Sequence, residues 1–322
     1  MNRSIHSVRQ SVKSLRNATL NVAGRNASWW FDDILALAAS SRPSALTGNQ
    51  IAALFGLDLC GMKAIQVTVQ PQGPDSRVSQ LVSRCPLIGR DASSMLSHVQ
   101  RDIEADGMKF HCAVGTALNP TKEEIKVYIG CADDGDNAGL SELLSRSGFM
   151  CPLETSLAQS LISSAKATCL FIGAGRRFGA RSGYTFYFSS GGEIGFRHID
   201  DVALPLGKAV VARFKTFHDG INEQSIAPIR WGWAITLSED GRLRSLKLEA
   251  TPSSGGFRIA RLMPTPDAEH YRWLKRVAIE IGAELHLQTV SCTLEPSGWG
   301  GCRYFKLDLA EGESMPTHGA IS

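Results

Sequence analysis

The chain lacks the sequence signals of several protein classes. Its eight cysteines are scattered over 322 residues, form no C-x-x-C pair and follow no secretory signal. No stretch approaches the roughly 20 apolar residues that a membrane-spanning helix needs. The eight histidines form no H-E-x-x-H motif and have no zinc-ligand spacing. We therefore expect a cytoplasmic protein with reduced thiols, no membrane insertion and no metal bound by its side chains.

Charge and composition are those of an ordinary globular protein. The formal net charge is +3, with 43% hydrophobic and 20% charged residues. This balance carries no signal for nucleic acid, and we expect no nucleic-acid partner. Residues 1–27 are rich in Ser, Asn and Arg, which predicts a flexible basic tail. We expect one domain over residues 28–312 and a second flexible tail at 313–322.

A repeated unit organises this domain. Strand-like alternation predicts five β-hairpins at 63–84, 109–130, 168–189, 230–250 and 287–309. Helical patterns occur at 29–40, 48–56, 93–105, 140–148, 153–166, 204–217 and 268–282. The hairpin centres are roughly 45 to 60 residues apart, a period typical of small units that must pack together to bury their apolar faces.

Each hairpin has one apolar face and one polar face. Ile125, Val127 and Ile129 alternate with Lys126 and Tyr128, and the strand at 304–309 alternates in the same way. A single surface sheet would expose its polar face to water. Five hairpins with covering helices favour an α+β protein instead, a closed antiparallel β-barrel of about ten strands built from repeated ααββ units, with the helices outside.

The polar face of this expected barrel gathers cations and phenols. The alternation directs Lys126, Lys247 and Lys306 inward, together with Tyr128, Tyr187 and Tyr304, three of only five tyrosines in the chain. Converging cations repel one another unless an anion lies among them, which favours a diphosphate ligand. Tyrosine rings beside it could stabilise an allylic cation through their π faces and shield it from water.

These strands resemble those of the aromatic prenyltransferases of the ABBA class, over about residues 60–310. The segment 124–130, with Lys126 and Tyr128, is similar to the family strand that carries a phosphate-binding lysine and a shielding tyrosine. The segments 233–237 and 240–248 are similar to the family's fourth hairpin, and 185–189 and 303–307 resemble other family strands. Within the class the chain looks most like bacterial enzymes, including the cyanobactin-type peptide prenyltransferases.

The resemblance implies a prenyltransferase of peptide or secondary-metabolite biosynthesis. It would move an allylic prenyl group, such as dimethylallyl, from its diphosphate to an electron-rich aromatic or peptide side-chain acceptor. Lys126, Lys247 and Lys306 would hold the diphosphate with Arg77 as a weaker candidate, and Tyr128, Tyr187 and Tyr304 would shield the cation. Mg²⁺ could accompany the diphosphate, although no cofactor bound by the protein is required.

The chain departs from the family pattern at the general base. Many members carry a glutamate on the first hairpin, whereas residues 62–68 contain no acid here. Glu249 or Asp308 could take this role, and His111 is a further candidate that could equally be structural. An acceptor that needs little base assistance, or a loss of activity, would also account for the missing acid.

Two other functions fit the repeat. A five-bladed α/β propeller that modifies guanidines would need an essential cysteine and histidine, for which Cys302 and His286 are the candidates. A non-catalytic barrel could carry a hydrophobic ligand.

The glycines of the segment 173–179 are interpreted as a hairpin tip, because a dinucleotide site needs a strand-to-helix junction.

Overall fold

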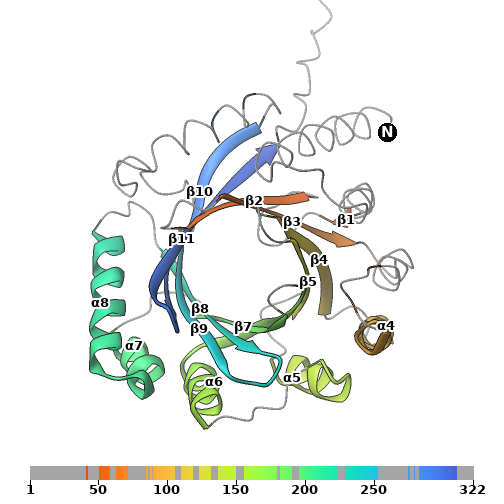
Figure 1. Cartoon of the computed structure of the whole chain (residues 1–322), viewed down its shortest axis with the longest axis horizontal. Helices are drawn as coiled ribbons and strands as arrows, with labels where there is room; N and C mark the ends of the chain where they lie inside the picture. The colour runs from red at the N-terminus through yellow and green to blue at the C-terminus, as the bar shows by residue number, and fades with distance from the viewer. Residues whose placement is uncertain are drawn as a thin grey trace, which may run out of the picture.

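A computed structural model describes residues 41–42, 51–58, 63–71, 85, 88, 90–105, 110–118, 123–131, 137–149, 156–179, 182–190, 196–223, 229–252, 275, 279 and 283–309. Within these ranges the chain alternates paired strands with helices (Figure 1). The helices are α4 (Arg90–Ala105), α5 (Asn137–Arg146), α6 (Ser156–Thr168), α7 (Phe196–Ala203) and α8 (Lys208–Asn222), with the 3₁₀ turn η2 (Leu204–Leu206). No helix among the described residues is long and apolar enough to cross a membrane.

Eleven strands form one antiparallel sheet. They are β1 (Ser41–Arg42), β2 (Ile51–Asp58), β3 (Lys63–Pro71), β4 (Phe110–Leu118), β5 (Glu123–Cys131), β6 (Leu170–Gly179), β7 (Gly183–Ser189), β8 (Ile229–Ser238), β9 (Leu243–Pro252), β10 (Ala283–Glu295) and β11 (Gly298–Leu309). Their order is β1-β3-β2-β11-β10-β9-β8-β7-β6-β5-β4. The α+β class and the antiparallel pairing are thereby confirmed.

The pairing of the strands runs in a ring. Besides pairing with β2, β3 pairs with β4, with Ile65 opposite Leu118 and Val69 opposite Val114. Each strand from β2 to β11 therefore has two hydrogen-bonded neighbours within this series, and β3 pairs with the short β1 as well. Figure 1 shows the strands arranged around a central axis with the helices on the outside.

The hydrophobic core lies between the strands and the helices. It contains the alternating residues Ile125, Val127 and Ile129 of β5, each at most 1% exposed. On α8, Phe214 packs edge-on against Trp233 of β8 with ring centroids 5.2 Å apart. Burying such aromatic side chains contributes about 1.5 to 3 kcal/mol each, so this layer provides much of the stability of the fold.

Four of the five predicted hairpins are confirmed, as β4–β5, β6–β7, β8–β9 and β10–β11. The first is wrong, because β3 forms its hairpin with the preceding β2 and has β4 as its other long neighbour. The predicted helix at 48–56 is also wrong, because Ile51–Asp58 form the strand β2. Its sequence, IAALFGLD, contains Ala and Leu at both odd and even positions, so it lacks the alternation typical of a strand. Residues 29–40, the sequence of another predicted helix, lie outside the described residues.

The glycine-rich segment 173–179 is also not a hairpin tip. It forms most of β6, and β7 begins at Gly183. The helix α7 was not predicted, because its eight residues are too few to establish a helical period. The predicted helices at 93–105, 140–148, 153–166 and 204–217 correspond to α4, α5, α6 and α8.

Candidate functional site

The candidate site lies on the face of the strands opposite the hydrophobic core, which we call the inner face. On β5, Lys126 and Tyr128 are half-buried and alternate with the core residues Ile125 and Val127. Successive side chains of a strand point to opposite faces, so Lys126 and Tyr128 belong to the inner face. The structure therefore places both residues on this face, and their predicted roles stay predictions.

The strand register carries the inner face from β5 to β9. Tyr128 pairs with Gly175 of β6, and two residues earlier on that strand Gly173 pairs with Tyr187 of β7. Tyr187 pairs with Ala234 of β8, which in turn pairs with Lys247 of β9. Directly opposed residues of a sheet share a face, so Tyr187 and Lys247 also lie on the inner face as predicted.

Two tyrosines meet on this face. The rings of Tyr128 and Tyr187 have centroids 6.1 Å apart and are tilted by 44°. Gly175 lies beneath them, and a Cβ atom there would approach Cδ1 of Tyr128 to 3.2 Å and Cε2 of Tyr187 to 3.4 Å. The glycine thus leaves the space that the two rings occupy.

Ion pairs flank the tyrosines. On β9, Nζ of Lys247 lies 3.3 Å from Oε1 of Glu249, and both side chains are about a quarter exposed. Nearer the hairpin turns, Nε of Arg177 on β6 lies 3.4 Å from Oε2 of Glu124 on β5. The two carboxylates, Glu124 and Glu249, are therefore each paired with a cation on the inner face.

The phenol of Tyr187 is held in its neutral form. Burial raises the pKa of Tyr187, and the Glu249 carboxylate acts in the same direction. The cations of Lys247 and Arg177 and a hydrogen bond from Thr185 oppose this rise without cancelling it. The ring is accordingly uncharged around neutral pH and offers its π face rather than a phenolate.

Much of the remaining inner face carries small side chains. The hydroxyls of Thr185 and Thr236 lie 3.2 Å apart, and those of Thr251 and Thr289 lie 2.9 Å apart. Inner positions without a bulky side chain on β4 to β8 are Ala113, Gly115, Gly130, Gly173, Gly175, Gly183, Gly232 and Ala234. At these positions a residue carries at most a methyl group, whereas the tyrosines and the charged side chains extend from the same face.

The structure describes the other predicted site residues less fully. For four of them it gives the backbone pairing only: His111 is opposite Gly130, Tyr304 opposite Thr289, Lys306 opposite His286 and Asp308 opposite Glu284. Arg77 lies outside the described residues. The roles predicted for all of these residues stay predictions.

Two charged residues of the inner face were missed. Glu124 lies two residues before Lys126, so the alternation that placed Lys126 inward would have placed Glu124 there too. Arg177 pairs with Lys126 across β5 and β6. It was overlooked because its glycine-rich segment was interpreted as a turn.

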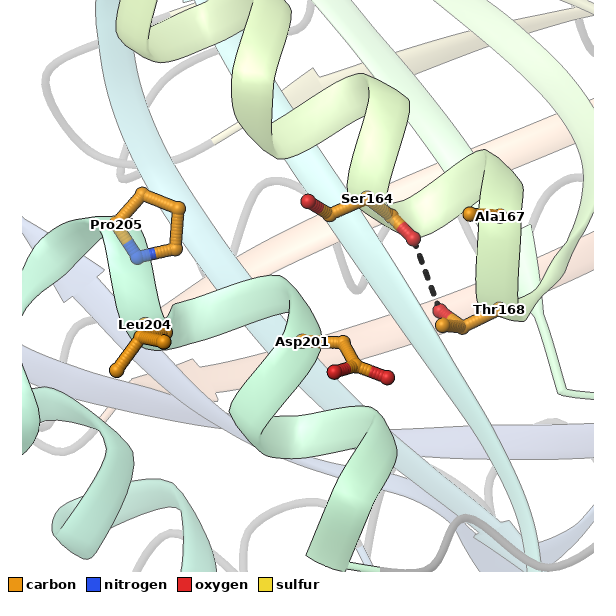
Figure 2. A pocket seen from close by; sticks show the side chains of 6 residues that line it. All are labelled: Ser164, Ala167, Thr168, Asp201, Leu204 and Pro205. Atoms are coloured by element: carbon orange, nitrogen blue, oxygen red, sulfur yellow. Dashed lines mark hydrogen bonds between the residues drawn. The ribbon is translucent and has the colours of Figure 1, made fainter.

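A hollow on the outside of the molecule lies between α6, α7 and η2 (Figure 2). It has a volume of about 490 Å³ and is lined by Ser164, Ala167, Thr168, Asp201, Leu204 and Pro205. Within it the Thr168 hydroxyl donates a 3.0 Å hydrogen bond to the Ser164 carbonyl oxygen. Among these six described residues the charged one is the acid Asp201, so their side chains do not suit a diphosphate. No cluster of three or more His, Cys, Asp or Glu suited to a metal occurs in the described ranges.

Solved structures with the same arrangement identify the fold. AnaPT from Neosartorya fischeri matches with a TM-score of 0.56 and 11% identity, over 88% of this chain and 88% of AnaPT. NotF, solved in complex with brevianamide F and DMSPP, matches with a TM-score of 0.57 and 12% identity, over 89% of this chain and 90% of NotF. Both are aromatic prenyltransferases of the ABBA class.

This chain has the ABBA prenyltransferase fold. The resemblance inferred from the hairpin strands is thus confirmed at the level of the fold, and the predicted likeness to cyanobactin-type enzymes stays a prediction. No sequence family model and no curated protein sequence matches the chain.

Proposed function

We propose that the chain is a prenyltransferase whose ring of strands acts as a closed barrel around the reaction chamber. The observation that carries this proposal is the inner face itself, on which Lys126 and Lys247 flank the paired rings of Tyr128 and Tyr187. A fold shared over most of the chain with two aromatic prenyltransferases adds support.

In this proposal the cations hold the diphosphate of the donor. Lys126 and Lys247 are the first candidates, and Arg177 joins them because it pairs with Lys126 across β5 and β6. Lys306 and Arg77 remain predicted contributors. Charge-assisted hydrogen bonds from such groups stabilise the leaving diphosphate as its C–O bond breaks. Mg²⁺ could share this neutralisation as a companion of the diphosphate.

The tyrosines would protect the allylic cation. When the carbon–oxygen bond of the donor breaks, both bonding electrons leave with the diphosphate and the prenyl carbon becomes positive. The π faces of Tyr128 and Tyr187 can stabilise this charge and exclude water, with Tyr304 as a predicted third ring. The neutral state of Tyr187 suits this role, because a phenolate would itself compete as a nucleophile.

The acceptor would supply the electrons of the new bond. An electron-rich aromatic ring or a peptide side chain attacks the prenyl carbon, and the proton that it loses passes to a base. Glu249 pairs with Lys247 and acts on the pKa of Tyr187, and it is our first candidate, with Asp308 and His111 as the alternatives. DMSPP, a prenyl diphosphate, and the aromatic acceptor brevianamide F in NotF are partners of the same two chemical kinds.

The two other functions stand differently. A five-bladed propeller is wrong, since β5–β6, β7–β8 and β9–β10 pair between hairpins and separate blades would not. A barrel that only carries a hydrophobic ligand would have the same fold, and turnover of a prenyl diphosphate distinguishes it from the enzyme.

Turnover is tested by incubating the full chain with dimethylallyl diphosphate and a panel of aromatic compounds and cyclic peptides, with mass spectrometry of the acceptors. We expect prenylated products with the wild type, and a large loss with Lys247→Ala. Lys215→Ala is the matched control, because Lys215 pairs with Asp200 at 2.8 Å among the outer helices. The proposal fails if no prenyl diphosphate is consumed, or if both variants lose activity equally.

A further inference from the structure

Two large apolar side chains are exposed at one end of the ring. Leu170 is 41% exposed and Ile172 is 38% exposed, whereas Phe171 between them is 3% exposed and belongs to the core. They lie where α6 joins β6, which we call the helix end of the ring, opposite the hairpin turns. Leaving two such side chains in water is unfavourable, so their position suggests a ligand.

A β-bulge brings both side chains toward the inner face. Leu170 pairs with Ser189, which lies two residues beyond Tyr187 on β7 and therefore shares the face of Tyr187. The register then shifts between Phe171 and Gly173, leaving Ile172 as the extra residue. Because Ile172 is exposed while Phe171 is buried under the helices, Ile172 does not share the core side of the strand.

The neighbouring inner positions carry small residues. Gly173 follows the bulge where the neighbouring backbone comes close, since a Cβ atom there would lie 2.8 Å from the carbonyl oxygen of Ile129. Ser189 pairs with Gly232, and Gly232 pairs with Glu249. One row of the sheet thus leads from Leu170 to the candidate base with only a serine and a glycine between them.

The inner face carries charged side chains toward both ends. Arg177 and Glu124 form their ion pair near the hairpin turns, and Lys126 lies beside them. Toward the helix end Lys247 pairs with Glu249, and the exposed Arg230 pairs with Thr251. What distinguishes the helix end is the exposed apolar surface of Leu170 and Ile172, which favours an apolar group there.

We propose that Leu170 and Ile172 form an apolar wall that selects the acceptor. This inference rests on the proposed function and specifies its second substrate: a neutral acceptor with an apolar body that lies on the wall at the helix end. Its nucleophilic atom reaches past Gly232 toward Glu249 and the tyrosine pair. Small zwitterions and strongly charged acceptors would gain nothing from this wall.

The wall is tested without any donor by titrating the protein with N-phenyl-1-naphthylamine, a neutral apolar dye. We expect saturable binding by the wild type, with the dissociation constant raised about tenfold or more by Leu170→Ser and by Ile172→Ser. Leu170→Met keeps the apolar area and should bind as the wild type does. Melting temperatures of all variants exclude a general loss of folding.

Leu204→Ser is the matched control, because Leu204 is 55% exposed and lines the outer hollow of Figure 2. The proposal is overturned if Leu204→Ser weakens dye binding as much as the wall variants, or if the wall variants bind normally. Binding of dimethylallyl diphosphate is measured in parallel and should be unchanged in the wall variants. Loss of donor binding or turnover in the wild type would instead contradict the proposed function, whatever the dye result.

Discussion

Three glycine-to-alanine substitutions should have three different effects, because the structure gives each added methyl group a different neighbour. At Gly173 the new Cβ would lie 2.8 Å from the backbone carbonyl oxygen of Ile129. At Gly175 it would meet the rings of Tyr128 and Tyr187. At Gly220, within α8, nothing lies within 4 Å.

The expected change in the free energy of unfolding depends on whether the atoms next to the added methyl group can move away from it. Backbone in a paired strand cannot yield, so Gly173→Ala should destabilise the protein by about 1 to 3 kcal/mol, the usual cost of overpacking. The tyrosine rings can turn by a few tenths of an ångström into the open inner face, so Gly175→Ala should cost less than about 1 kcal/mol. Gly220→Ala should stabilise by up to about 1 kcal/mol, the helix propensity difference.

Urea unfolding at equilibrium measures all three changes. Tyrosine-selective NMR adds a second readout, since the chain has only five tyrosines and Gly175→Ala should shift the signals of two of them. Equal destabilisation by Gly173→Ala and Gly175→Ala, or unchanged tyrosine signals in Gly175→Ala, would refute the packing described for the inner face.

Three further predictions concern single groups. Burial raises the pKa of Tyr187, so above about pH 10 the unfolded chain releases this proton before the folded protein does. The free energy of unfolding, measured as a function of pH, should therefore fall as pH rises in this range, and it should fall less steeply in Tyr187→Phe. Thr236→Val removes one partner of the partly buried hydroxyl pair with Thr185 and should cost about 0.5 to 1.5 kcal/mol by urea unfolding, whereas the exposed helix variant Thr216→Val should cost less. Burial raises the pKa of Cys112 to about 12 and that of Cys292 to about 11, so iodoacetamide at about pH 8 should modify them only after unfolding, as peptide mass spectrometry can show.

Alternation was enough to predict most of the strands and the faces of their residues. A period of two is a local property, so Lys126, Tyr128, Tyr187 and Lys247 could be directed inward before any strand pairing was known. The cross-strand neighbours follow from register, which the hairpin turns largely fix. The meeting of Tyr128 and Tyr187 also needs the absence of a side chain at Gly175, which only the packed structure reveals.

The errors have physical reasons as well. The segment 48–56 is rich in Ala and Leu, residues that favour helices, and the pairing of β2 with β3 and β11 overrides that local preference. Arg177 was missed because glycines commonly mark turns, whereas in β6 Gly173 and Gly175 leave space for close backbone contacts and for tyrosine rings. The bulge at Ile172 could not be predicted, because nothing in the alternation signals a single unpaired residue.

The most direct test of the account is the dissociation constant of dimethylallyl diphosphate, measured by calorimetry for the wild type and for lysine variants. Lys126→Ala and Lys247→Ala should each weaken binding by about 1.5 to 3 kcal/mol, the scale of a hydrogen bond to a charged group, or roughly 10- to 150-fold. Lys215→Ala, on the outer helix α8, should bind as the wild type does. Wild-type affinity in both inner-face variants would contradict the claim that these lysines hold the diphosphate.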